Sequence, residues 1–174
     1  LSSDIKNNLE LLEKTLNILK SKTYDFLAYA PIHGNSPKDY AQFVENVLKL
    51  ESHSQKKFDG FAIGGIANYR EKDNKIWGIP ESSNSRIKAG IIVSKAVKAV
   101  RTVLDSKQDM RPIHGLGVGS VELIIPLVHA GSDSFDAHSA WRRATDGSRD
   151  NAKFVNNYSQ TGSFSKFLIP LLDD

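Results

Sequence analysis

The sequence predicts an α/β protein of the (β/α)8 TIM-barrel type, in which residues 1–174 form one partial barrel domain with roughly the last four βα units. Four short apolar runs alternate with longer segments whose apolar residues recur every three or four positions, the pattern of strands alternating with amphipathic helices. These runs end in glycine or polar residues. Barrel enzymes carry their site residues at such strand ends.

The first half of the chain predicts two helices and two strands. Apolar residues at intervals of four and three over 5–19 indicate a helix, with Ser3 as its N-cap. The apolar run Tyr24–Ala30 is expected to be a strand, followed by a loop over 31–35. Ser36 and a first-turn proline then open the second helix. Its buried stripe is expected to be Tyr40, Phe43, Val44, Val47 and Leu48.

The second half repeats the alternation. The run Gly60–Ile66 is expected to be a strand that ends in a double glycine, and the polar residues 68–83 are expected to be a loop. A helix is then expected to begin at Ser85, with Ile87, Ile91, Val97 and Val100 on its buried face. It is followed by a strand over Pro112–Gly119, a helix that begins at Ser120 and ends at Gly131, and a strand over Ser134–Asp136. An apolar segment over 164–172 is expected to form an edge strand or a docking segment.

Composition limits the kinds of partner and cofactor. The chain has no cysteine, so disulfides and thiolate metal ligands are excluded, and a cytoplasmic location is expected. The sequence holds no run of 18 or more apolar residues, so we expect no membrane span. We expect no cofactor and no bound metal. A net charge of +3 permits a polyanionic partner without demanding one.

The segment around Asp136 is the strongest candidate for chemistry. Asp136 ends the last predicted strand, and Trp141, Arg142 and Arg143 follow it closely. A strand-end carboxylate can act as a nucleophile, and cationic and flat side chains beside it can contact phosphates and stack on bases. The alternative is structural, with Asp136 capping a turn and the two arginines solvated.

Four motifs together resemble the carboxyl-terminal half of the tRNA-guanine transglycosylase barrel, and most closely its branch that installs 7-deazaguanine bases in DNA. Ile32-His33-Gly34 stands where the family has Val-Gln-Gly, and the strand ending in Gly64-Gly65-Ile66 is similar to the family's Ala-Ile-Gly-Gly-Leu strand end. The other two matches are His114-Gly115-Leu116-Gly117, where the family has Met-Gly-Val-Gly, and Ser134-Phe135-Asp136, where it has Met-Phe-Asp.

The resemblance implies base exchange, in which guanine leaves its sugar and a 7-deazaguanine such as preQ0 or preQ1 replaces it. Asp136 would be the nucleophile that forms a covalent glycosyl intermediate. Trp141, Arg142 and Arg143 would contact the nucleic acid. The residues implied around the base are His33, Gly34, Gly64, Gly65, Ile66, Gly115 and Gly117.

Departures from the family pattern leave alternatives open. The cysteine-rich zinc site of the tRNA branch cannot form in this chain, which favours DNA slightly over tRNA as the polymer. The family's second catalytic aspartate belongs to the amino-terminal half of the barrel, so a second chain or a missing amino-terminal half is an expected partner. One alternative is therefore a non-catalytic accessory or nucleic-acid-binding relative that needs a partner to complete the barrel. Another is an unrelated phosphate-binding barrel enzyme that uses the glycines of 115–119 and the helix start at Ser120.

The individual motifs also have structural readings. Gly64 and Gly65 can form only a tight turn, His33 can serve as a hydrogen-bonding loop residue, and His114 is expected to be structural.

Overall fold

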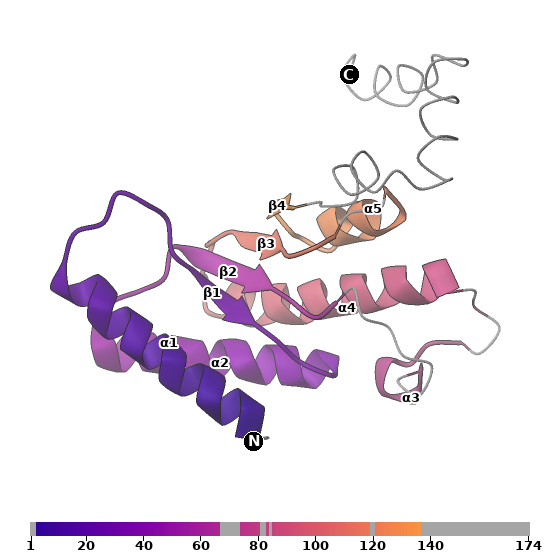
Figure 1. Cartoon of the computed structure of the whole chain (residues 1–174). Coiled ribbons are helices and arrows are strands. Elements are labelled where there is room, and N and C mark those ends of the chain that lie inside the picture. The colour runs from indigo at the N-terminus through magenta and orange to yellow at the C-terminus, as the bar shows by residue number, and fades with distance from the viewer. Residues whose placement is uncertain (1–2, 67–73, 81–82, 84, 119–120, 137–174) are drawn as a thin grey trace, which may run out of the picture. The chain divides into compact units, whose positions relative to one another are not determined.

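Four parallel strands form the central sheet of the protein (Figure 1). A computed structural model describes residues 3–66, 74–80, 83, 85–118 and 121–136. The strands pair in sequence order, each parallel to the next, which confirms the predicted α/β class with a parallel sheet. They are β1 (Tyr29–Ile32), β2 (Gly60–Ile63), β3 (Ile113–Gly115) and β4 (Ser134–Phe135).

The chain divides into two units, Leu1–Ala137 and His138–Asp174. All described residues lie in the first unit. A single domain over 1–174 therefore stays a prediction, and the expected segment at 164–172 lies outside the described residues.

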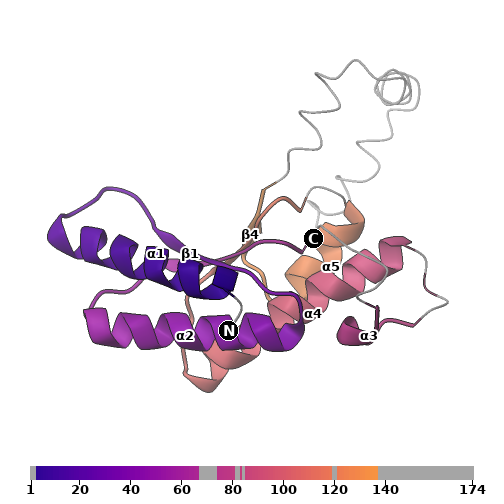
Figure 2. The ribbon, with the colours of Figure 1, turned by 60° about the horizontal axis from the view of Figure 1, so that its bottom comes forward.

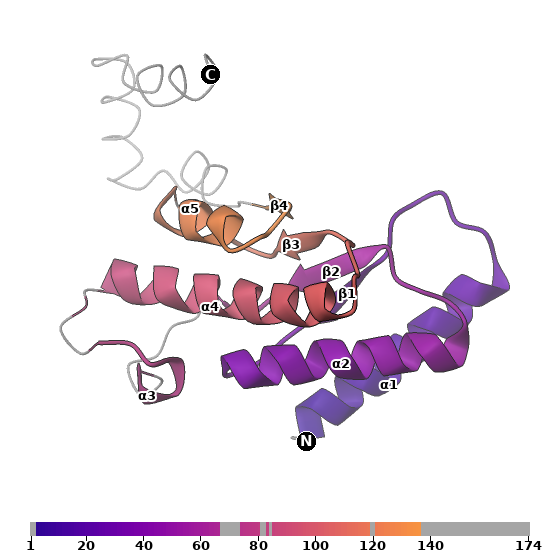
Figure 3. The ribbon, with the colours of Figure 1, turned by 180° about the vertical axis from the view of Figure 1, so that it is seen from behind.

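Helices between the strands cover one face of the sheet, and a further helix precedes β1. They are α1 (Ser3–Ser21), α2 (Pro37–Ser54), α3 (Asn74–Trp77), α4 (Ser85–Ser106) and α5 (Val121–His129). Parallel strand–helix–strand connections are right-handed, and a strand order without reversal puts successive helices on the same side. Figure 3 shows α2 and α4 side by side across that face, and Figure 2 shows α1 alongside α2.

Burial alternates along β1 and β3 as this arrangement requires, whereas all four residues of β2 are buried. Ile32 of β1, Ile63 of β2 and Ile113 of β3 are fully buried in one hydrophobic core with the helices. The neighbouring residues Pro31 and His114 point to the other face, because successive side chains of a strand alternate. Pro31 is exposed and His114 is partly buried, so the second face, called the open face below, carries the less buried side chains.

Most predicted elements exist, and their bounds differ for local reasons. The first strand begins at Tyr29 rather than Tyr24, and Phe26 and Leu27 ahead of it are 59% and 73% exposed. The ladder starts there because Asp59 N–H donates to Ala28 O while the Asp59 carboxylate accepts from Ala28 N–H. These two bonds fix where β1 meets β2.

Three further differences concern helices and turns. Of the predicted buried face of α4, Val97 and Val100 are fully buried and Ile91 packs against the core, whereas Ile87 is 53% exposed. The segment expected to be a loop over 68–83 contains α3, whose Trp77 is buried. The strand expected over 60–66 ends at Ile63, and Gly65 follows with a φ of +76°.

The second helix confirms the sequence signals at its start. Ser36 is the N-cap of α2, and its Oγ accepts a hydrogen bond from Asp39 N–H at 3.1 Å. Of the predicted stripe, Tyr40, Phe43, Val44 and Val47 are buried, and Leu48 packs against the core while partly exposed.

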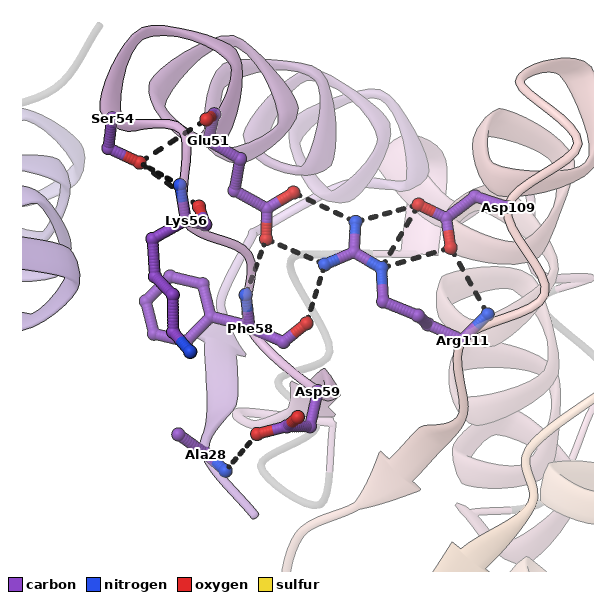
Figure 4. Close-up of polar contacts among 8 residues, drawn as sticks. All are labelled: Ala28, Glu51, Ser54, Lys56, Phe58, Asp59, Asp109 and Arg111. Carbon is purple, nitrogen blue, oxygen red and sulfur yellow. Dashed lines mark hydrogen bonds and ion pairs between the residues drawn. The ribbon is translucent and has the colours of Figure 1, made fainter. Parts of the chain in front are cut away.

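The charged side chains of Arg111, Glu51 and Asp109 form a hydrogen-bonded cluster near the amino ends of the strands (Figure 4). Arg111, just before β3, donates to both carboxylate oxygens of Glu51 at 2.6 and 2.8 Å and to Phe58 O at 2.8 Å. It also bonds Asp109, and its guanidinium lies 4.6 Å from the centre of the Phe61 ring. Glu51 is 3% exposed, so a buried carboxylate receives a bidentate arginine here.

Among the described residues, no helix is long and apolar enough to cross a membrane.

Candidate active site at the carboxyl ends of the strands

The predicted site residues lie along one edge of the sheet, in one group after β1 and β2 and another around the ends of β3 and β4. Parallel strands point the same way, so the segments that follow them lie at the same edge. His33 and Gly34 follow β1, the double glycine follows β2, and Asp136 follows β4. The structure therefore places motifs that are far apart in the sequence along the same edge, with direct contacts within each of the two groups.

The Asp136 carboxylate is oriented by two groups from the β3 side. Its Oδ1 accepts a hydrogen bond from Gly117 N–H at 2.9 Å and lies 3.2 Å from His114 Nε2. The backbone N–H of Asp136 donates to Gly115 O at 3.3 Å, which extends the β3–β4 ladder past Phe135. The Asp136 side chain is 42% exposed. A carboxylate that is held in one direction and reaches solvent is suited to attack a bound substrate.

His114 is the residue of this site whose role the sequence does not reveal. In the β3–β4 register His114 faces Ser134, and its Nδ1 lies 2.8 Å from Ser134 Oγ. The ring of Tyr29 approaches the imidazole edge-on, with 6.5 Å between ring centres. Ser134 and Asp136 are two residues apart and so share a face of the strand. The spacing of Ser134 and Asp136 is the only local sequence signal of this arrangement. Their contact with His114 depends on how β3 and β4 pair, which the local sequence does not determine.

His33 lies directly against Gly64. A Cβ placed at Gly64 would come within 2.6 Å of His33 Cε1 and 2.9 Å of its Nδ1, so only glycine lets the imidazole occupy this position. Although His33 reaches solvent, its partial burial lowers the pKa of the imidazole, because burial disfavours the charged form. His33 is therefore a neutral donor and acceptor near pH 7.

Tyr40 of α2 contacts the turns that follow β1 and β2. Its hydroxyl donates to Gly64 O at 2.6 Å, and its ring packs so closely on Gly34 that a Cβ there would lie 2.9 Å from Tyr40 Cδ2. Burial raises the pKa of Tyr40 to about 12, so the hydroxyl stays protonated and keeps donating. Tyr40, a buried residue of α2, thus positions the two turns next to His33.

The glycines differ in what they can offer a ligand. The N–H of Gly64 already donates to Ile32 O, so it is not available to a ligand. Ile66 is buried in the core and does not reach a ligand either. Gly65 is exposed and follows with positive φ. Gly115 packs against Leu127, where a Cβ would come within 2.8 Å, so it serves close packing. Gly117 has a φ of +70° and uses its N–H to orient Asp136.

The remaining site predictions lie outside the described residues. Trp141, Arg142, Arg143 and Ser120 belong to that part of the chain. Within the described residues, no group of three or more His, Cys, Asp or Glu side chains is placed to hold a metal ion.

No protein-family model matches this chain, and the search of curated proteins gives no significant match.

Proposed function

We propose that this protein is part of a (β/α)8 barrel that exchanges guanine in a nucleic acid for a 7-deazaguanine base of the preQ0 or preQ1 type. The observation that carries the proposal is the Asp136 carboxylate, oriented at the carboxyl end of β4 by Gly117 N–H and placed beside His114. Support for the barrel comes from the unreversed parallel strand order, since doubly wound sheets reverse theirs.

The chemistry needs one carboxylate that acts twice. An oxygen of Asp136 attacks the anomeric carbon, the bond from that carbon to the guanine nitrogen breaks, and guanine takes up a proton as it leaves. The incoming 7-deazaguanine then attacks the same carbon, loses a proton, and displaces the carboxylate. Two inversions give net retention, and the two protons balance over the cycle.

Base and polymer would be bound by different parts of the chain. His33 and the backbone at Gly65 are the open groups near the strand ends that can meet a purine edge. We assign contact with the sugar–phosphate backbone and stacking to Trp141, Arg142 and Arg143, with DNA slightly preferred over tRNA. The target nucleotide has to leave its stack to reach Asp136. The reaction needs no cofactor, and the cysteine-free composition favours a cytoplasmic location.

A second candidate is a non-catalytic relative that binds nucleic acid and relies on a partner for catalysis. The observation that favours it is Pro31. The backbone N–H groups of Asp59 and Gly64 donate to Ala28 O and Ile32 O. The backbone polar groups of even-numbered residues in β1 therefore point toward β2, and those of Pro31 point toward the outer edge of the sheet. Proline has no N–H for a further strand, and edge strands that end a sheet often carry it there. Pro31 therefore counts against direct pairing of another barrel strand with β1, and so against a complete catalytic barrel.

The experiment that separates the two candidates measures release of labelled guanine from duplex DNA and from tRNA in the presence of preQ0. It uses the whole chain, its Asp136→Asn variant, and Asp105→Asn as the matched control. Asp105 is an exposed carboxylate on α4 that takes no part in the site. We expect exchange with the parent chain and with Asp105→Asn, and none with Asp136→Asn.

Each other outcome has a defined meaning. Equal exchange by Asp136→Asn and the parent chain would remove Asp136 as the nucleophile. A folded chain that binds either polymer but releases no guanine would support the accessory candidate.

A further inference from the structure

The side chain of His114 contacts two polar groups at the same time, Ser134 in β4 and Asp136 directly after that strand. Nδ1 lies 2.8 Å from Ser134 Oγ, and Nε2 lies 3.2 Å from Asp136 Oδ1. The three side chains share the open face because His114 and Ser134 are register partners and Asp136 follows Ser134 by two residues. They form one chain from hydroxyl to imidazole to carboxylate.

We infer that His114 is a positioning residue for Asp136, with its proton on Nε2, where it meets the carboxylate, and with Nδ1 as the acceptor for the Ser134 hydroxyl. A neutral imidazole has one donor and one acceptor nitrogen, and an ionised carboxylate can only accept. Nε2 therefore donates to Asp136 Oδ1, and Nδ1 is left as the acceptor for the Ser134 hydroxyl. The proposal departs from the resemblance, because the family has methionine where this chain has His114.

Two donors to Asp136 act on the same oxygen. His114 Nε2–H and Gly117 N–H converge on Oδ1 at 3.2 and 2.9 Å. Donors fixed before the reaction fix the direction of the carboxylate and stabilise its charge each time it returns. If Asp136 is the nucleophile of the proposed function, on which this consequence rests, these bonds assist the second displacement, in which the carboxylate leaves.

The assignment of the tautomer is tested without any activity. Nitrogen chemical shifts of ¹⁵N-labelled histidine report which ring nitrogen carries the proton. They would be recorded above about pH 8, where an ordinary imidazole is neutral. His114→Gln identifies the His114 signals among the five histidines. We expect Nε2–H in the parent chain. The Nδ1 shift should change in Ser134→Ala, because Nδ1 loses its hydrogen-bond donor, and should be preserved in Ser134→Thr, which keeps the hydroxyl.

The effect on exchange is tested with a matched pair of variants. His114→Phe keeps a flat ring and removes both hydrogen bonds, whereas His114→Gln keeps an amide donor. Loss of one hydrogen bond to a charged group corresponds to about 10- to 100-fold in rate. We expect His114→Phe to lower kcat by that factor with little change in KM, and His114→Gln to recover part of it. A residue with only a structural role would not be rescued in this way.

The outcomes separate this inference from the proposed function. An Nδ1–H tautomer in the parent chain, or spectra that Ser134→Ala leaves unchanged, would overturn the inference whatever the exchange assay shows. The expected tautomers together with no exchange by any variant would support the hydrogen-bonded chain and count against the transglycosylase reaction.

Discussion

The two ends of the parallel sheet are built differently. At the amino ends, Arg111, Glu51 and Asp109 form a largely buried cluster of charge-assisted hydrogen bonds, with the Arg111 guanidinium over the Phe61 ring. At the carboxyl ends, Asp136 is 42% exposed and turns follow the strands with positive φ at Gly65 and Gly117. One end holds the strands in register, and the other presents side chains to solvent.

Substitutions at the amino ends should therefore affect folding, and substitutions at the carboxyl ends should affect chemistry. In barrel enzymes the amino ends of the strands serve stability and the carboxyl ends carry the active site. A buried ion pair responds strongly when one partner is removed, because the other is left buried and uncompensated. A half-exposed group can instead be replaced at small cost in stability.

The largest expected effect is on Arg111. Arg111→Met removes every bond to Glu51 that the guanidinium makes and leaves a carboxylate that is 3% exposed without a cation. We expect the free energy of unfolding, measured in urea, to fall by about 3–5 kcal/mol, the cost of breaking a buried pair.

A double variant is the control for this interpretation. Arg111→Met combined with Glu51→Gln removes the uncompensated charge, so it should be more stable than Arg111→Met alone. If the double variant loses the sum of the two single effects, the pair does not act as a unit, and the contrast between the two ends becomes weaker.

An intermediate effect is expected at Gly64, where the carboxyl end is tightly packed. Gly64→Ala places a Cβ 2.6 Å from His33 Cε1, so the imidazole has to move. We expect a loss of about 1–3 kcal/mol, as for other overpacked sites, together with shifted His33 resonances. Gly117→Ala is the comparison, because its added Cβ has open space and only its φ of +70° is unfavourable. Unchanged His33 resonances in Gly64→Ala would show that the imidazole does not rest on this glycine.

Local sequence patterns predict the features that neighbouring residues determine. The alternation of helices and strands, the Ser36 cap and the placement of Asp136 at a strand end all follow from neighbouring residues. The partners of Arg111 and of His114 could not be found this way, because Glu51 is 60 residues from Arg111 and Asp136 is 22 residues from His114. Such contacts depend on strand register, which no single segment determines. The start of β1 was predicted five residues early for the same reason, since Asp59 sets it.

A smaller effect, which depends on pH, is expected from Asp109. The side-chain hydrogen bonds from Arg111 hold the pKa of Asp109 below its usual range. A carboxyl whose pKa is lower in the folded state stabilises the protein above its unfolded pKa of about 4 and loses that contribution as pH falls through the folded value. We expect urea midpoints to decrease below about pH 4, and less steeply in Asp109→Asn. A variant with the parent's pH dependence would show that other carboxyls dominate acid unfolding.

The smallest expected effect on stability is at Asp136. Asp136→Asn keeps an oxygen that can accept from Gly117 N–H and removes a charge from a side chain that is 42% exposed. We expect the free energy of unfolding to change by less than about 0.5 kcal/mol, as for most substitutions outside the core. Glu51→Gln is the same chemical change at the buried end, and it should cost several times more. A loss at Asp136 as large as that at Glu51 would mean that the carboxylate, too, holds the sheet together. A gain in stability would instead fit a group kept for chemistry at some cost to the fold.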